Sequence, residues 1–425
     1  MPTSPTLPEG PWQRTARAAG LLRTAEVRPT IFAEMTALAQ RTGALNLGQG
    51  FPDSDGPPSV LAAAQQAIAD GVNQYPPGPG SADLRRAVAA HQQRHYHLDV
   101  DPDTEVLVTT GATEAIAAAV LALAGPGDEV LTLEPFYDSY AAVIALSGAT
   151  HTTAGLQPTP EGFRLDVGAL REAATARTRL ILLNSPHNPT GAVLSADELA
   201  AVAAVAAERD AIVVTDEVYE HLTYDGAAHL PIATLPGMAA RTLTISSAGK
   251  SFAVTGWKIG WVTGPAELVT AVRSVKQFLT YTTGAPFQPA VAVGLDLETT
   301  TRPDATWLRD QAASLAHRRD LLDAGLQAAG LTTATPQGAY FVMADAAPLL
   351  TGGLAGRGVG TGADLCRALP ELAGVVAVPA TAFTSPGSTA DLTLATWLRF
   401  TFVKSEETIT AAVARLGRLG SQLSA

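Results

Sequence analysis

Short apolar stretches typical of buried strands alternate with stretches of helical spacing from about residue 59 to about residue 298. The apolar stretches are rich in Val, Ile and Leu, and glycine or polar residues follow them. This pattern predicts βαβ units, in which right-handed crossovers cover both faces of a mostly parallel sheet. The expected strands are residues 105–109, 129–133, 180–183, 211–215 and 242–245, and the expected helices are 59–69, 83–95, 113–124 and 196–209.

The pattern changes after about residue 298. A long helix is expected over 305–329 and a final one over 406–419, with strands at 340–344, 375–378 and 397–402 and a glycine-rich loop at 351–362. We therefore predict an α/β chain with a large domain (59–298) and a smaller α+β domain (299–425). Residues 31–58 are expected to join the small domain. Residues 1–30, with several prolines and arginines and no apolar stretch, are expected to form a mobile N-terminal arm.

Composition excludes several classes of function. The net charge of −12 over 425 residues disfavours nucleic acid, whose phosphates would be repelled. The longest apolar run, 115–124, is about half of what a bilayer requires. The single cysteine, Cys366, cannot form an internal disulfide, which is compatible with a reducing compartment. We expect a cytoplasmic protein that binds neither nucleic acid nor membrane.

Ligands of open α/β sheets bind outside the carboxyl ends of the strands, so the residues that follow each strand are the candidate site. Gly111 opens a helix directly after a strand, where backbone N–H groups can hold a phosphate, although many ordinary strand–turn–helix units look the same. Asp216 ends an apolar strand. It is either a capping carboxylate or a buried one, and a buried one needs a cationic partner.

Two lysines lie in one glycine-punctuated segment after the strand at 242–245. Lys250 is flanked by Ser247 and Ser251, and Lys258 follows eight residues later, in S-S-A-G-K-S-F-A-V-T-G-W-K-I-G. Burial favours the neutral, nucleophilic form of a lysine amine, which can form a Schiff base. Either lysine alone is more simply a solvated charge, but the pair in this context indicates a site.

The same segment resembles the cofactor-lysine motif of class I/II aminotransferases of fold type I. Other stretches resemble that family in the family's own order, across about residues 31–419. They are N-L-G-Q-G-F-P-D from Asn46, N-Q-Y from Asn73, G-A-T-E-A from Gly111, E-P-F-Y-D from Glu134, S-P-H-N-P-T-G from Ser185, T-D-E-V-Y from Thr215, G-A-Y-F from Gly338 and R-F-T-F from Arg399.

The resemblance implies that the chain binds pyridoxal 5'-phosphate. Lys250 would carry it as a Schiff base and move the proton at the substrate Cα. Asp216 would pair with the pyridinium nitrogen, and Asn188 and Tyr219 would hydrogen-bond the phenolate oxygen. Phe136 would stack on the ring. The residues expected to bind the phosphate are Ala112, Thr113, Ser247 and Lys258.

The resemblance also implies how substrate is bound. Arg399 would hold the α-carboxylate with a bidentate pair of hydrogen bonds. Phe32, Gly50 and Asn188 would line the substrate pocket. Tyr75 would reach the phosphate from a neighbouring subunit, so a homodimer is expected. The expected reaction moves an amino group from an amino acid to a 2-oxo acid, with 2-oxoglutarate as the expected acceptor.

The chain departs from the kynurenine-type branch of this family. The aromatic–histidine pair that lines the pocket there falls on Thr283 and Gly284. Phe32 stands where that branch has Trp, and Thr113 where it has Tyr. Fewer aromatic walls favour a longer or more polar substrate, so N-succinyl-LL-diaminopimelate is the first choice. A kynurenine/glutamine-type aminotransferase with cysteine-S-conjugate β-lyase activity is the alternative.

Other classes have less support. A regulator that senses an amine with this fold would need an N-terminal DNA-binding domain, and only about 30 residues precede the resemblance. No residue of the sequence specifically indicates an oxidase or a cyclase built on the same fold. The sequence holds no H-E-x-x-H motif, and His95 and His97 are two apart, so no metal site is predicted.

Overall fold

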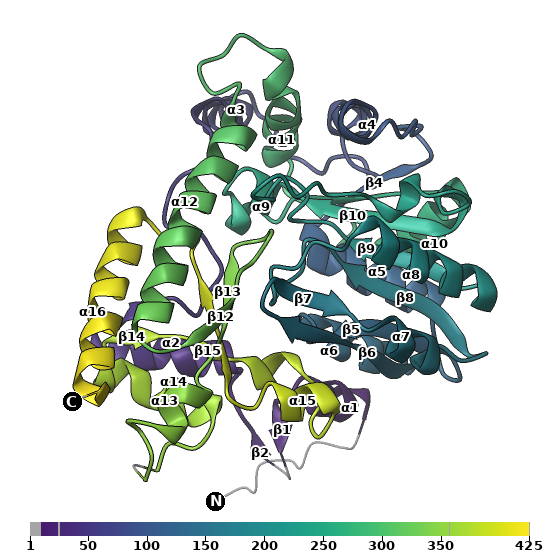
Figure 1. Ribbon diagram of the computed structural model, residues 1–425. Helices are drawn as coiled ribbons and strands as arrows, with labels where there is room; N and C mark the ends of the chain where they lie inside the picture. The colour runs from purple at the N-terminus through teal and green to yellow at the C-terminus, as the bar shows by residue number, and fades with distance from the viewer. Residues whose placement is uncertain (1–9, 24–25, 357, 425) are drawn as a thin grey trace, which may run out of the picture.

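A large sheet forms the centre of the protein in the computed structural model, which describes residues 10–23, 26–356 and 358–424 (Figure 1). It has eight strands in the order β4-β11-β10-β9-β8-β5-β6-β7. β11 and β7 run antiparallel to their neighbours, and the other adjacent pairs are parallel. The strands are β4 (Val106–Thr109), β5 (Glu129–Glu134), β6 (Thr150–Thr159), β7 (Gly162–Leu165), β8 (Thr178–Asn184), β9 (Ile212–Asp216), β10 (Thr242–Ser247) and β11 (Gly260–Thr263). The predicted mostly parallel sheet is confirmed.

Both faces of this sheet are buried, which explains the apolar runs within its central strands. Along β8, Leu180 and Leu182 pack with the core of α5, α6 and α10, whereas Ile181 and Leu183 pack with α7 and α8. Successive side chains of a strand point to opposite faces, so a strand covered on both sides must be apolar throughout. The helices of this part are α3 (Pro58–Ala69), α4 (Ala82–Tyr96), α5 (Gly111–Leu123), α6 (Ser139–Ser147), α7 (Val167–Ala173), α8 (Ala196–Arg209), α9 (Ala248–Ser251), α10 (Ala266–Lys276) and α11 (Phe287–Asp296).

A second, antiparallel sheet lies in the C-terminal part, in the order β12-β13-β16-β15. The long helix α12 packs against α16 beside it (Figure 1). The elements are α12 (Trp307–Ala328), β12 (Thr332–Ala334), β13 (Phe341–Asp345), α13 (Ala347–Thr351), α14 (Gly362–Leu372), β14 (Val375–Val376), β15 (Val378–Pro379), α15 (Thr389–Thr393), β16 (Trp397–Thr401) and α16 (Glu406–Ser424).

The segment before α3 is built into this smaller part. β3 (Leu45–Asn46) pairs in parallel with β14, and α2 (Ile31–Thr42) packs on α14. The strand expected over 375–378 is divided, because β14 pairs with β3 while β15 pairs with β16.

The expected mobile arm is wrong for residues 10–23. Helix α1 (Pro11–Ala18) starts with Pro11 at its first position, where a proline costs no hydrogen bond. It packs on α6, and Arg14 Nε donates to the carbonyl oxygen of Ala145 at 3.0 Å. Strands β1 (Leu22–Arg23) and β2 (Glu26–Val27) then pair with each other. Residues 1–9 of the expected arm lie outside the described residues. No described helix could span a bilayer.

Candidate active site

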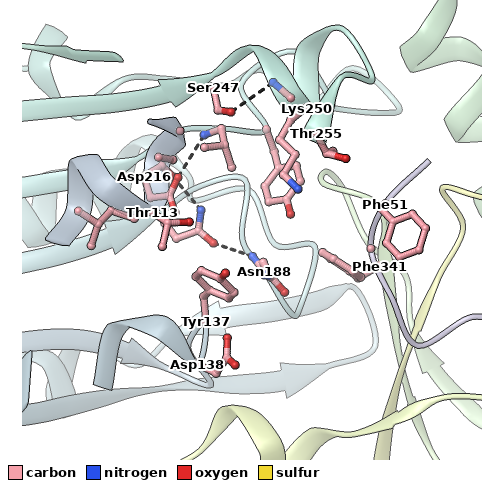
Figure 2. Close-up of a pocket in the computed structure, with 18 of the residues that line it drawn as sticks. Phe51, Thr113, Tyr137, Asp138, Asn188, Asp216, Ser247, Lys250, Thr255 and Phe341 are labelled. Carbon is pink, nitrogen blue, oxygen red and sulfur yellow. Dashed lines mark hydrogen bonds between the residues drawn. The ribbon is translucent and has the colours of Figure 1, made fainter. Parts of the chain in front are cut away.

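A cavity of about 420 Å³ lies at the carboxyl ends of the parallel strands, between the large sheet and the smaller part of the chain. Figure 2 shows Lys250, Asp216, Asn188 and Tyr137 around it, each from a different segment of the chain. The residues that line it are Phe32, Gln49, Gly50, Phe51, Gly111, Ala112, Thr113, Ile116, Tyr137, Asp138, Asn184, Asn188, Asp216, Val218, Tyr219, Ser247, Gly249, Lys250, Thr255, Lys258, Phe341 and Arg399.

Asp216, the last residue of β9, is a buried carboxylate without a cationic hydrogen-bond partner among the described residues. Its Oδ2 accepts from the Tyr140 hydroxyl at 2.7 Å, and its Oδ1 accepts from the backbone N–H of Val218 at 3.4 Å. Burial raises the pKa of Asp216 to about 6, partly offset by those two hydrogen bonds. A cation delivered by a ligand would remove this penalty.

The start of α5 forms an anion-binding cradle. Gly111 has φ +71°, which lets the chain turn sharply from β4 into the helix. A Cβ at Gly260 would lie 2.7 Å from the Gly111 carbonyl carbon, so the close approach of β11 requires glycine. Lys258 Nζ lies 3.5 Å from Thr113 Oγ1, and Ser247 lines the same end of the cavity. Free helix N–H groups, a hydroxyl and a lysine are a typical phosphate-binding set.

Lys250 lies on the short helix α9, directly after β10. Its Nζ donates to the Tyr340 hydroxyl at 2.8 Å, and that hydroxyl donates to the carbonyl oxygen of Gly50 at 2.6 Å. A Cβ at Gly50 would lie 2.6 Å from the Phe341 ring and 2.8 Å from the Tyr340 ring. Only glycine therefore allows the 46–53 segment to close over the amine.

Arg399, on β16, is a buried guanidinium at the opposite side of the cavity. Nη1 donates to Asn188 Oδ1 at 2.9 Å and Nη2 to the carbonyl oxygen of Gly48 at 2.8 Å. The guanidinium lies 4.1 Å from the ring centre of Phe341 and 4.5 Å from that of Phe383. Nε is buried and has no hydrogen-bond partner among the described residues. Burial lowers the pKa of Arg399 to about 10, so an anionic ligand would be strongly favoured here.

These groups match what pyridoxal phosphate presents. The Asp216 carboxylate, which has no cationic hydrogen-bond partner among the described residues, suits a protonated pyridine nitrogen. The α5 cradle suits a phosphate, and Lys250 offers an amine in the same cavity. Asn188 uses Oδ1 to accept from Arg399, which leaves its amide N–H₂ free to donate to a ring oxygen. Tyr219 is buried beside it, and its ring packs edge-on against Tyr340 at 5.0 Å.

Most of the residues that the sequence singled out come together here. Eleven line the cavity: Phe32, Gly50, Ala112, Thr113, Asn188, Asp216, Tyr219, Ser247, Lys250, Lys258 and Arg399. Tyr75 does not. Its side chain is 82% exposed and lies edge-on to Tyr281 at 5.5 Å, in a separate surface hollow.

The expected stacking of Phe136 on the cofactor ring is wrong. Phe136 is buried in the hydrophobic core and meets His151 edge-on at 4.8 Å, and its backbone N–H donates to the carbonyl oxygen of Phe383. The next residue, Tyr137, lines the cavity instead. The turn after β5 sends the first aromatic into the core and the second into the site, which a motif alone does not reveal.

Other site residues were missed. Tyr140, in the first turn of α6, reaches Asp216, and Tyr340 reaches Lys250. Asp138 also lines the cavity, and burial raises the pKa of its carboxyl. The available signal was a second tyrosine, Tyr140, only three residues after Tyr137 in Y-D-S-Y.

The fold and the cavity define a pyridoxal-phosphate enzyme of the aminotransferase class. The family model "Aminotransferase class I and II" matches residues 42–416, and the chain belongs to this family. Such enzymes take an amino acid and a 2-oxo acid as substrates and depend on pyridoxal phosphate.

Individual relatives are similar over nearly the whole chain. A protein of Mycobacterium tuberculosis described as "Probable N-succinyldiaminopimelate aminotransferase DapC" is 56% identical over 397 residues, 92% of this chain and 96% of the relative. The structure of N-succinyldiaminopimelate aminotransferase from that organism superposes with a TM-score of 0.86, covering 92% of this chain and 97% of the other. A kynurenine–oxoglutarate transaminase of Dictyostelium discoideum is 34% identical over 422 residues, 93% and 95% of the two chains.

Proposed function

We propose that this protein is an N-succinyl-LL-diaminopimelate aminotransferase that transfers the amino group to 2-oxoglutarate. The observation that carries the proposal is the 56% identity, over 92% of the chain, with a relative of that description. The cavity supports it with a buried guanidinium, Arg399, for one α-carboxylate.

Bound pyridoxal phosphate supplies an electron sink for the pair released at the substrate Cα. Lys250 is proposed to hold the cofactor covalently at rest, and its Nζ to take and return the proton at Cα. The Tyr340 hydroxyl, 2.8 Å from Nζ, orients the amine toward the cavity. Gly50 fixes that tyrosine in turn, because its carbonyl accepts from the hydroxyl.

Asp216 is proposed to pair with the pyridine nitrogen, held in place by the Tyr140 hydroxyl. Asn188 and Tyr219 would donate to the ring oxygen, and Tyr137 would contact the ring from the side of α6. The α5 start, Ser247 and Lys258 would bind the phosphate. Each of these side chains would then hold one part of the cofactor in the cavity that Lys250 and Arg399 also line.

The departures at Thr283 and Gly284 support a substrate other than kynurenine. Both residues lie in the surface hollow with Tyr75 rather than in the cavity of their own chain. A Cβ at Gly284 would lie 2.7 Å from the Phe287 ring. A histidine at this position would therefore displace Phe287. This chain has no side chain at position 284 that could contact a substrate.

The test is a panel of amino donors with 2-oxoglutarate, read by glutamate release. We expect kcat/KM for N-succinyl-LL-diaminopimelate to exceed that for kynurenine, glutamine and methionine. Faster turnover of kynurenine would instead support the kynurenine/glutamine-type alternative. Release of pyruvate and ammonia from a cysteine S-conjugate without added 2-oxo acid would support β-lyase activity.

The role of Lys250 is tested separately from turnover. Borohydride reduction of the holoenzyme should fix the cofactor to the peptide that contains Lys250, as a mass gain in peptide mass spectrometry. Lys258 serves as the control, because it lies in the same segment and is expected to stay unmodified. Labelling of Lys258 in place of Lys250 would contradict the assignment.

We further propose a homodimer in which Tyr75 reaches the phosphate of the partner's site. The Tyr75 side chain is 82% exposed, and its neighbour Tyr281, 42% exposed, packs edge-on against it at 5.5 Å. Mixing Lys250→Ala with Tyr75→Ala subunits tests this. If Tyr75 acts across the interface, one site of each mixed dimer has both residues intact and activity returns. No recovery would place Tyr75 in the site of its own chain. The cytoplasmic location stays a prediction.

A further inference from the structure

Three histidines from distant parts of the chain meet beside α4. His91 and His95 lie one turn apart on that helix, and His221 follows β9. One ring nitrogen of each lies within 4.8 Å of the other two, and His91 Nε2 is 2.7 Å from His221 Nε2. Within the described ranges no other group of three histidine, cysteine or carboxylate side chains is arranged in this way.

His95 brings a carboxylate to the cluster. The contact between His91 and His221 uses one ring nitrogen of each. His95 Nε2 is buried and lies 2.9 Å from Glu298 Oε2. The side chains of His95 and Glu298 are 23% and 33% exposed, so an ion can reach them from solvent.

The geometry of the three rings suits a shared ion. The ring centres of His91, His95 and His221 lie 4.5 to 4.9 Å apart, so that one nitrogen of each can approach a common point. Imidazole is also the commonest metal ligand among protein side chains. Three imidazoles with one carboxylate are donors that Zn²⁺ accepts in a tetrahedral site.

We propose that His91, His95 and His221 bind a divalent transition-metal ion, Zn²⁺ in the first place, with Glu298 as the fourth ligand. Tetrahedral Zn²⁺ with bonds of about 2.0–2.1 Å holds its donors roughly 3.3 Å apart. The ion replaces the direct contact between His91 and His221, whose nitrogens separate, while His95 moves inward by side-chain rotation. None of the four residues lines the cofactor cavity.

The position of the cluster gives such an ion a structural role. Glu220, next to His221, accepts from the Tyr96 hydroxyl at 2.6 Å and from the Ser246 hydroxyl. Ser246 immediately precedes Ser247 on β10, and the loop of Glu220 follows Asp216 and also contains Tyr219. An ion held by α4 and this loop would therefore fix the loop behind the cofactor site against the helix at the β4 edge of the sheet (Figure 1).

Zinc titration of the tag-free, chelator-treated holoenzyme, against a competing chromophoric chelator, tests the site. We expect one ion per chain and roughly tenfold or greater weakening in His95→Ala, since losing one ligand removes a direct bond. Zinc should also raise the Tm of the wild type and leave that of His95→Ala unchanged. The matched control is His97→Ala, because His97 caps the same helix outside the cluster.

Equal zinc affinity in His95→Ala and the wild type would overturn the proposal and leave the cluster as a hydrogen-bonded network. Cobalt gives a second readout that does not depend on comparing variants. Wild-type protein loaded with Co²⁺ should show the intense visible absorption of a tetrahedral complex. A weak, octahedral spectrum would also overturn the proposal. Because the ligands lie outside the cavity, neither outcome bears on the aminotransferase assignment.

Discussion

The hydroxyl of Tyr140 donates a 2.7 Å hydrogen bond to Asp216 Oδ2, and both side chains are buried. Tyr140 belongs to α6 and Asp216 ends β9, so two elements that are separated by 76 positions fix this carboxylate. The bond opposes the effect of burial, which raises the pKa of Asp216 to about 6. Tyr140 thereby keeps the carboxylate ready for a cationic ring nitrogen.

Replacing Tyr140 with Phe should weaken cofactor binding. A hydrogen bond to a charged group contributes about 1.5–3 kcal/mol, which corresponds to a loss of roughly ten- to a hundredfold in affinity. Absorbance titration of the apoprotein with pyridoxal phosphate measures this loss. Tyr224→Phe is the control, because its buried hydroxyl donates to the Ala339 carbonyl outside the cavity. Equal loss in both variants would show that Tyr140 acts through packing alone.

Asp216→Asn should make the apoprotein more stable at neutral pH. The pKa of Asp216 rises from 3.8 to about 6 on folding, so the folded state favours the protonated form. The resulting penalty is absent below about pH 4, grows as pH rises to about 6, and then stays near 3 kcal/mol. Asn carries no charge, so the variant does not incur this penalty. Urea unfolding of the two apoproteins from pH 4 to 8 should show curves that converge at low pH. A constant difference at every pH would contradict this account.

The parallel strands and the order of the site motifs could be predicted because both depend on local sequence. The centre of β8, residues 180–183, is apolar since two helical layers cover it. Lys250 follows β10 closely and Asp216 ends β9. Strands β6 and β7 were missed. They lie at the edge of the sheet, where one of them, T-H-T-T-A-G-L-Q-P-T, is largely polar and has no apolar run to detect.

The details that the sequence left open depend on contacts between distant residues. Phe136 and Tyr137 are adjacent aromatics, and only the packing after β5 decides which one enters the cavity. Tyr340 reaches Lys250 across 90 positions. The histidine cluster could not be predicted for the same reason. His91 and His95 are close in sequence, but only the fold brings His221 next to them.

Gly260→Ala should damage the phosphate cradle. The new Cβ would lie 2.7 Å from the Gly111 carbonyl carbon and 2.8 Å from the Ala112 nitrogen, and backbone cannot yield as a flexible side chain can. We expect the start of α5 to shift and cofactor affinity to fall more than about tenfold, since oriented N–H groups bind the phosphate. Inorganic phosphate should also compete less well for the apoprotein. Gly256→Ala is the matched control, because no atom lies within 4 Å of its added Cβ. Similar cofactor affinities in the two variants would show that the start of α5 does not contribute to phosphate binding.

Arg399→Lys should separate substrate recognition from cofactor binding. The guanidinium donates one hydrogen bond to Asn188 and one to the Gly48 carbonyl. Its remaining N–H groups, including the buried Nε, can donate to an anion. A lysine ammonium cannot repeat this planar arrangement. Losing one or two charge-assisted hydrogen bonds of about 1.5–3 kcal/mol each should lower kcat/KM at least tenfold for amino acids. An amine substrate without a carboxylate should lose much less, and the absorbance of the bound cofactor should not change. Equal losses for both substrates would mean that Arg399 supports the site through its contacts with Phe341 and Phe383 and does not bind the carboxylate.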